Sequence, residues 1–129
     1  ALAAAEIAAN EVLRIINASF DDARDYPDGV TTFCYKLAKY FDIHEGKIGC
    51  PVSATLHGRP DNAPFRDALS KILACWMDRI ANHAHRLGQS TEEATKSAKR
   101  LFRSLEGSWT LARARGDSNV IRQLPTIVC

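Results

Sequence analysis

The sequence lacks a long run of apolar residues, and it lacks a strong excess of charge of one sign. No apolar stretch approaches the roughly 20 residues that a helix needs to cross a bilayer, so a membrane-spanning protein is excluded. The 17 basic and 15 acidic side chains give a formal net charge of only +2, whereas a domain that binds nucleic acid over much of its surface is far more basic. We therefore expect a soluble protein, and the net charge says little about its partners.

The four cysteines lack any C-x-x-C spacing. Cys34, Cys50, Cys75 and Cys129 are spread along the chain, a pattern that fits neither a zinc site nor a small secreted disulfide scaffold. We expect no signal peptide before them. Their spacing favours a reducing, cytoplasmic environment, and we expect neither a structural metal nor a cofactor.

A period-two alternation of apolar and polar residues, which would indicate a half-buried strand, is absent as well. Helical periodicity is present instead, and 129 residues of which 46% are hydrophobic suffice for one domain with a sizeable core. The expected fold is therefore all-α, with about five helices. They are expected over residues 2–20, about 30–41, about 51–57, about 62–87 and about 91–115. Residues 21–29 are expected to form a loop, because this segment is acidic and contains Pro27 and Gly29.

The ends of the last two expected helices carry clear local signals. Ser90 is followed three residues later by Glu93, which predicts a capping box at the start of the last helix. Gly88 is expected to end the helix before it, and Gly116 is expected to end the last one.

The last expected helix has two different faces. Its apolar face holds Ala94, Ala98, Leu101, Leu105, Trp109 and Ala112, and its opposite side holds Lys96, Lys99, Arg100 and Arg103. Gly107 also falls on the opposite side, where Leu111 and Ala114 follow it. A glycine inside a helix costs about 1 kcal/mol relative to alanine, and close packing against a partner would offset this cost. The alternative, equally open, is a tolerated glycine beside one exposed leucine. The basic residues are expected to be solvated, because no helix-turn-helix pattern accompanies them.

Four local patterns follow one another along the chain: G-C-P at 49–51, Phe65 with Leu69 and Trp76, S-T-E-E at 90–93, and L-E-G-x-x-x-L-A-R at 105–113. In this order they resemble the C-terminal regulatory domain of TetR-type (tetracycline-repressor-type) transcriptional regulators, over nearly the whole chain. The chain departs from that family in containing no N-terminal three-helix DNA-binding domain. It begins at Ala1 without a methionine or a helix cap, so we expect residues 1–129 to be the ligand-binding and dimerisation domain of a longer protein.

The resemblance implies a mechanism and a set of partners. Residues 2–20 match the helix that links the DNA-binding unit to the regulatory core, and the last two long, antiparallel helices pair with those of a second subunit in a four-helix bundle. The other helices surround a pocket for a small hydrophobic or aromatic effector, whose binding shifts the linking helix and releases DNA. This implies a homodimeric repressor that contacts DNA only through the missing N-terminal domain, with no membrane partner and no enzymatic activity.

Candidate site residues follow from these implied roles. The ligand-binding candidates lie on inward stripes of the helices that would enclose the pocket, and they are Ile16, Phe20, Phe33, Leu37, Leu56, Trp76 and Trp109. Each of them also fits a plain core position. The dimer-interface candidates lie on the last two long helices, and they are Ile80, His83, Ala84, Leu87, Gly107, Leu111 and Ala114.

Two groups of polar residues have both functional and structural interpretations. Cys50, Ser53 and His57 share one face of the short third helix, but Cys50 and His57 are about 10 Å apart along the helix axis, too far for a nucleophile and its base. A polar pocket wall or a plain exposed face fits them better. His83 lies in an apolar stripe, where a histidine satisfied by hydrogen bonds is the default and a ligand-binding or pH-sensing role is the alternative.

Two other classes of function remain open. The main alternative is a stand-alone helical module that binds small molecules or proteins and has no DNA-binding part. A small helical enzyme is the third class, and it has the least support because no catalytic constellation forms around Cys50 or a histidine.

Overall fold

The computed structural model describes residues 2–43 and 63–129, and the regular structure in both ranges is helical. The helices are α1 (Leu2–Phe20), α2 (Tyr26–Ile43), α4 (Ala63–Arg86), α5 (Thr91–Arg115), α6 (Asn119–Arg122) and α7 (Pro125–Val128). No strand occurs in these two ranges, so the predicted all-α fold is confirmed. The short helix expected at about 51–57 lies outside the described residues.

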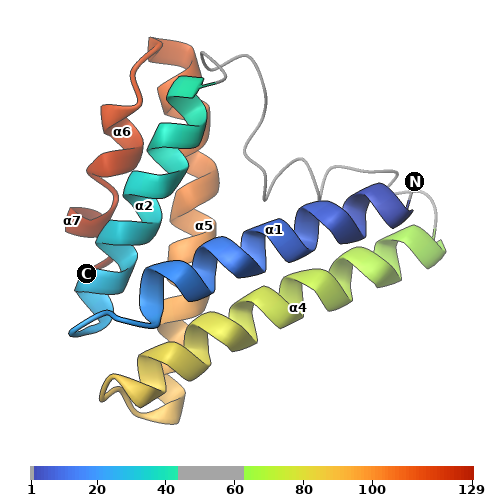
Figure 1. Ribbon diagram of the computed structural model, residues 1–129, viewed down its shortest axis with the longest axis horizontal. Helices are drawn as coiled ribbons and strands as arrows, with labels where there is room; N and C mark the ends of the chain where they lie inside the picture. Colours follow the sequence, from blue (N-terminus) through green and yellow to red (C-terminus); the bar gives the residue numbers. More distant parts are fainter. Residues whose placement is uncertain (1, 44–62) are drawn as a thin grey trace.

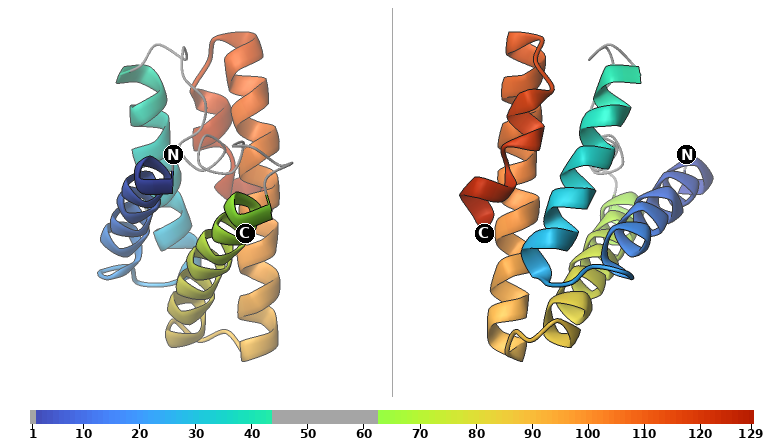
Figure 2. Two further views of the ribbon diagram at one scale, coloured as in Figure 1. Left: turned by 90° about the vertical axis from the view of Figure 1, so that its right-hand side faces the viewer. Right: turned by 60° about the vertical axis from the view of Figure 1, so that its left-hand side comes forward.

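Two pairs of long helices form the body of the fold (Figure 1). α1 and α4 lie side by side, and α2 and α5 stand across them. α1 meets α2, and α4 meets α5, at a short turn from which the two helices diverge (Figure 2). The short helices α6 and α7 cover α2 and α5 on the side away from α4. The predicted pair of long consecutive helices is therefore present as α4 and α5.

The core lies where these four helices meet. α1 contributes Val12, Ile16 and Phe20 at a spacing of four residues, and each of these side chains is at most 1% exposed. Leu101 and Leu105 of α5 are fully buried at the same spacing. The apolar face that the sequence predicts for the last long helix is thus the face that forms the core.

Both ends of α5 are fixed by local contacts. Ser90 precedes the helix, and its hydroxyl oxygen accepts a hydrogen bond from the backbone N–H of Glu93 at 3.1 Å. Gly116 follows the helix with a φ of 63°, in the left-handed region that favours glycine. The predicted start at residue 91 and end at residue 115 are both confirmed.

The predicted loop over residues 21–29 is wrong beyond Asp25, because α2 begins at Tyr26. The side chain of Asp25 accepts a hydrogen bond from the backbone N–H of Asp28 at 2.8 Å, which caps the new helix. Pro27 falls in the first turn, where its missing N–H has no intrahelical partner to lose. Gly29 is buried because the aromatic ring of Phe20 lies directly against its α-carbon.

The periodicity predicts no helix after Gly116, whereas the structure has two helices of four residues each. α6 is attached to α2 by Arg122, whose guanidinium donates to the Asp42 carboxylate at 2.8 Å and lies 5.8 Å from the ring centroid of Tyr35. This hydrogen bond lowers the pKa of Asp42 below its ordinary value. Helices this short depend on such tertiary contacts, which periodicity does not reveal.

Candidate functional site

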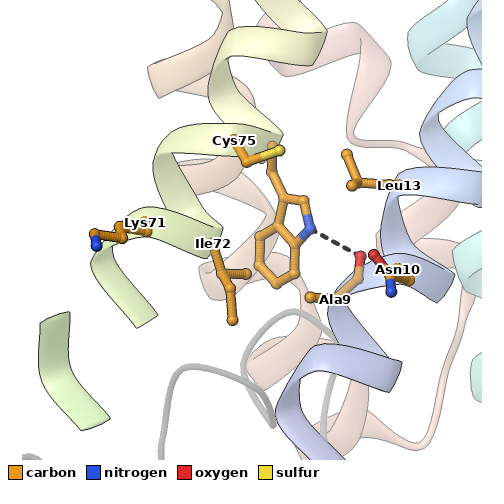
Figure 3. A pocket seen from close by; sticks show the side chains of 7 residues that line it. Ala9, Asn10, Leu13, Lys71, Ile72 and Cys75 are labelled. Carbon is orange, nitrogen blue, oxygen red and sulfur yellow. Dashed lines mark hydrogen bonds between the residues drawn. The ribbon is translucent and has the colours of Figure 1, made fainter. Parts of the chain in front are cut away.

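An open hollow of about 360 Å³ lies between α1 and α4. Ala9, Asn10 and Leu13 of α1 form one side of it, and Lys71, Ile72, Cys75 and Trp76 of α4 form the other (Figure 3). This volume is at the lower end of the range of small-molecule sites in proteins. The hollow is therefore a candidate ligand site at the seam of the two helices.

Trp76 is a fully buried lining residue of this hollow, and its indole is held from both sides. Its Nε1 donates a hydrogen bond to the carbonyl oxygen of Ala9 at 3.1 Å, so the ring bridges α4 to α1 (Figure 3). Its ring stacks on Phe102 of α5 with 6.2 Å between centroids. The only hydrogen-bond donor of the Trp76 side chain, its indole N–H, is thus already used, so the buried ring contributes only apolar atoms to the wall of the hollow.

The polar groups of the hollow are at its edge. Asn10, Lys71 and Cys75 are exposed, and the ammonium group of Lys71 points away from the indole (Figure 3). The interior is formed by Leu13, Ile72 and the Trp76 ring. An apolar interior with polar groups at the edge suits a small, mainly hydrophobic ligand.

A second polar arrangement ties the end of α1 to the end of α4. Arg86 donates hydrogen bonds to the carbonyl oxygen of Phe20 at 2.9 Å and to Nδ1 of His83 at 3.0 Å. Nε2 of His83 lies 3.1 Å from Oδ1 of Asn17, which also accepts a bond from Arg79 at 3.2 Å. The His83 ring stacks on Phe20, with 5.4 Å between centroids. We name Asn17, Arg79, His83 and Arg86 the α1–α4 clamp.

These partners determine the protonation state of His83. Arginine only donates, so Nδ1 must accept from Arg86, and Nε2 must carry the proton that is shared with Asn17. The ring is therefore neutral. Burial lowers the pKa of His83 below the ordinary 6.5, and the positive charges of Arg86 and Arg79 lower the pKa further, against an opposite effect of Asp21. Of the two interpretations of His83 from sequence, the structure shows the histidine satisfied by hydrogen bonds.

The chain is expected to lose stability as the pH falls below about 6.5, the ordinary pKa of histidine. Above this value His83 is neutral in both the folded and the unfolded chain, and its full contribution to the free energy of unfolding is present. Below it the unfolded chain binds the proton first, because the folded pKa is lowered, so the free energy of unfolding falls as the pH falls through the folded pKa. Urea denaturation between pH 5 and 8 measures this dependence.

A matched pair of variants isolates the contribution of His83. His83→Gln keeps a neutral acceptor and donor, so the free energy of unfolding should change less between pH 5 and 6.5 than in the wild type. His85→Gln changes an exposed histidine of the same helix and should leave the slope unchanged. If the free energy of unfolding changed equally with pH in all three proteins, the pKa of His83 would not be lowered in the folded chain.

Residues 27–126 match the family model described as transcriptional regulator LmrA/YxaF-like, C-terminal domain. The chain belongs to this family. The predicted resemblance to TetR-type regulators is thereby confirmed, and the matched region runs from the first turn of α2 into α7. Searches of curated proteins and of solved structures returned no match.

In this LmrA/YxaF-like chain, the predicted ligand-binding residues do not gather around one hollow. Trp76 lines the hollow between α1 and α4. The core buries Ile16 and Phe20 of α1, Phe33 and Leu37 of α2, and Trp109 of α5, and Leu56 lies outside the described residues. The other residues that line the hollow were not candidates, although Ala9 and Leu13, like Ile72 and Trp76, are spaced four apart on their helices.

The predicted interface residues of the LmrA/YxaF-like chain fall into two groups. Ile80, His83 and Ala84 are buried within the chain itself, and Leu87 is half-buried. Gly107, Leu111 and Ala114 are exposed on the outer side of α5. Only the second group has much surface left for a partner, so the interface prediction now depends mainly on α5.

The remaining expectations from the sequence concern a polar face of the short third helix, a metal site and a membrane span. Cys50, Ser53 and His57 lie outside the described residues. Within residues 2–43 and 63–129, no three His, Cys, Asp or Glu side chains are placed to hold a metal ion together. In the same ranges, no helix combines the length and the apolar character that crossing a bilayer requires.

Proposed function

We propose that this chain is the effector-binding and dimerisation domain of a TetR-like repressor, which a small hydrophobic ligand releases from DNA. The observation that supports the effector site most directly is the open hollow between α1 and α4, with Leu13, Ile72 and the buried Trp76 among its lining residues. The family match supports a regulatory domain. DNA contact is assigned to a part of the protein outside residues 1–129.

The position of the hollow provides a physical route from ligand to DNA. Its residues on α1, Ala9 to Leu13, lie in the first two-thirds of that helix, while the α1–α4 clamp holds its last turn. A ligand between α1 and α4 would therefore move the beginning of α1 and leave its end in place. Such a ligand changes the equilibrium between two positions of α1 only by its difference in affinity for them.

The effector site can be tested by a thermal-shift screen of small apolar compounds against this chain. A compound that binds only the folded state at about 100 times its Kd adds about 2.7 kcal/mol to the free energy of unfolding and raises Tm. Cys75→Trp would fill the hollow and should abolish the shift, whereas Ala18→Trp on the exposed side of α1 should not. In the full-length protein, the same compound should release an operator fragment in a gel-shift assay. A shift that survives in Cys75→Trp would place the ligand elsewhere.

The outer side of α5 supports the proposed homodimer. Its first half carries Lys96, Lys99, Arg100 and Arg103, which together line a basic depression. Its second half carries Gly107, Leu111 and Ala114, which are exposed, and the exposed Arg113 and Arg115 lie in the last turn. Apart from the adjoining backbone of α5, no atom of the described residues lies within 4 Å of the position that a Cβ on Gly107 would take, and Leu111 is 49% exposed. A small residue beside an exposed leucine allows a second helix to approach closely and bury apolar surface.

Leu111→Glu is expected to weaken dimerisation at least tenfold, because a carboxylate would replace an apolar contact at the centre of the proposed interface. Sedimentation-velocity analysis over a range of concentrations measures the change. Ala18→Glu places the same charge on an exposed residue of α1 and should leave the dimer intact. An unchanged dimer in Leu111→Glu would place the interface on another surface.

A further inference from the structure

One buried hydrogen bond connects the middle of α1 to α4. The indole N–H of Trp76 donates to the carbonyl oxygen of Ala9 at 3.1 Å, and the Trp76 side chain is fully buried. The other hydrogen bonds between the two helices belong to the α1–α4 clamp, which begins at Asn17, about two turns further along α1. Among the described side chains, no other hydrogen bond ties the first two-thirds of α1 to α4.

The two partners of this bond differ in what they would lose if it broke. A carbonyl oxygen can accept two hydrogen bonds, and inside a helix the oxygen of Ala9 also accepts from the backbone N–H four residues later. The indole of Trp76 has one proton to donate, so without Ala9 this N–H would be left buried and unpaired. The cost falls on Trp76, and it favours the position of α1 in which the bond is made.

The Trp76 ring is held in place from the side opposite to α1. It stacks on Phe102 of α5, with 6.2 Å between centroids and 20° between planes, and the Phe102 side chain is itself buried. α4 and α5 pack against each other, so the ring is fixed within this pair of helices (Figure 1). If α1 moves away from α4, the indole cannot follow it. A separation of about 1 Å is enough to take the two atoms beyond hydrogen-bonding distance.

Ala9 and Trp76 both line the hollow between α1 and α4 (Figure 3). The bond therefore lies where a ligand between the two helices would act. We propose that the hydrogen bond from Trp76 to Ala9 holds the first two-thirds of α1 in its ligand-free position, and that an effector acts by breaking this bond. The inference rests on the proposed function and adds the contact through which the site is regulated. The clamp stays closed, because Arg86 and His83 hold only the last turn of α1.

The test removes the N–H group and keeps the shape of the ring. Trp76 is replaced by benzothienylalanine, in which a sulfur atom takes the place of the indole N–H. The same replacement at Trp109 is the matched control. Trp109 is also buried, but no acceptor of the described residues lies within hydrogen-bonding distance of its Nε1. The two replacements therefore make the same chemical change, and only the one at Trp76 removes a bond between helices.

The movement of α1 is measured by the rate at which N-ethylmaleimide labels a buried thiol, because this rate follows the population in which the thiol is exposed. Val12→Cys places the thiol in the first two-thirds of α1, and Ser19→Cys places it in the last turn; both residues are buried. Both variants carry Cys75→Ser, which removes the exposed thiol of the hollow. Labelling is followed by mass spectrometry of the α1 peptides.

We expect the replacement of Trp76 to raise the labelling rate of the thiol introduced at Val12 about tenfold, as the loss of one hydrogen bond predicts. The rate at Ser19 should change by less than about twofold, because the clamp is intact. The same replacement at Trp109 should change neither rate. An unchanged rate at Val12, or an equal acceleration at Val12 and Ser19, would overturn the inference, since the bond would then not hold this part of α1 specifically.

Naphthalene serves as the apolar probe of the hollow, and its binding to the chain is registered as a rise in Tm. If it binds, it should accelerate labelling at Val12 and leave the rate at Ser19 unchanged. Binding without faster labelling at Val12 would overturn the inference, because a ligand would then occupy the chain without breaking the bond. If naphthalene does not bind but the replacement of Trp76 has its tenfold effect, the role of the bond is supported and the proposed apolar effector site is contradicted.

Discussion

Gly29→Ala is expected to lower the free energy of unfolding by about 3 kcal/mol, the upper part of the range for overpacked cores. A Cβ at this position would overlap Cδ1 and Cε1 of the Phe20 ring. That ring cannot move aside easily, because it is fully buried and is stacked on His83. The usual gain from replacing a helical glycine with alanine, about 1 kcal/mol, is too small to offset the overlap. Urea denaturation of the purified variant measures the loss.

A second helical glycine provides the matched control. Gly107 lies inside α5, and no atom of the described residues outside the adjoining backbone of that helix is within 4 Å of the place its Cβ would take. Gly107→Ala should therefore raise the stability of the single chain by up to about 1 kcal/mol. Both substitutions are best measured in the Leu111→Glu background, where association is expected to be weakened. If both substitutions lowered the free energy of unfolding, the loss in Gly29→Ala could not be assigned to the packing of Phe20 on Gly29.

Arg86→Ala is expected to lower the free energy of unfolding by about 2 kcal/mol, as is typical when hydrogen bonds from a charged group are lost. One guanidinium nitrogen serves both Phe20 and His83, so a single truncation removes one bond between α4 and α1 and a second bond within α4. It also leaves Nδ1 of His83 without its donor. The urea concentration at the denaturation midpoint should fall, whereas the slope of the unfolding free energy against urea concentration should stay the same, because the surface exposed on unfolding is nearly unchanged.

Two further variants test whether the geometry of Arg86 or only its charge matters. Arg86→Lys keeps the charge but lacks the planar set of donors, so it should recover less than half of the loss. Arg103→Ala removes an exposed arginine of α5 and should change stability by less than about 0.5 kcal/mol. Full recovery by lysine would show that the charge alone stabilises the end of α1.

Some elements of the fold could be predicted from the sequence because their signals are local. The start and end of α5 follow from Ser90 and Gly116, which act within their own turn of the chain. The start of α2 could not be predicted, because Pro27 and Gly29 indicate a loop when they are considered alone. Their helical conformation depends on the cap from Asp25 and on the ring of Phe20, which comes from another helix.

The candidate site was harder to predict for a related reason. A residue that lines a hollow and a residue that fills a core both lie on the inward stripe of a helix, so periodicity could not separate Trp76 from Ile16 or Phe33. The difference depends on which side chains the neighbouring helices present. The clamp shows the same limit: His83 could be predicted to have hydrogen-bond partners, but Asn17 is 66 residues away in the sequence.

The packing of Phe20 fixes one end of α1, so a tilt of this helix would move its other end furthest. Its ring lies against Gly29 and His83, and its carbonyl is held by Arg86, so the end of the 19-residue helix is the fixed point. A helix of this length reaches about 28 Å, and tilting it by about 10° around Phe20 would carry its first residue through about 5 Å. Leu13 is seven residues from Phe20 and Leu2 is eighteen, so a ligand that separates α1 from α4 by about 1 Å near Leu13 would move the N-terminal end of α1 by about 2.5 Å.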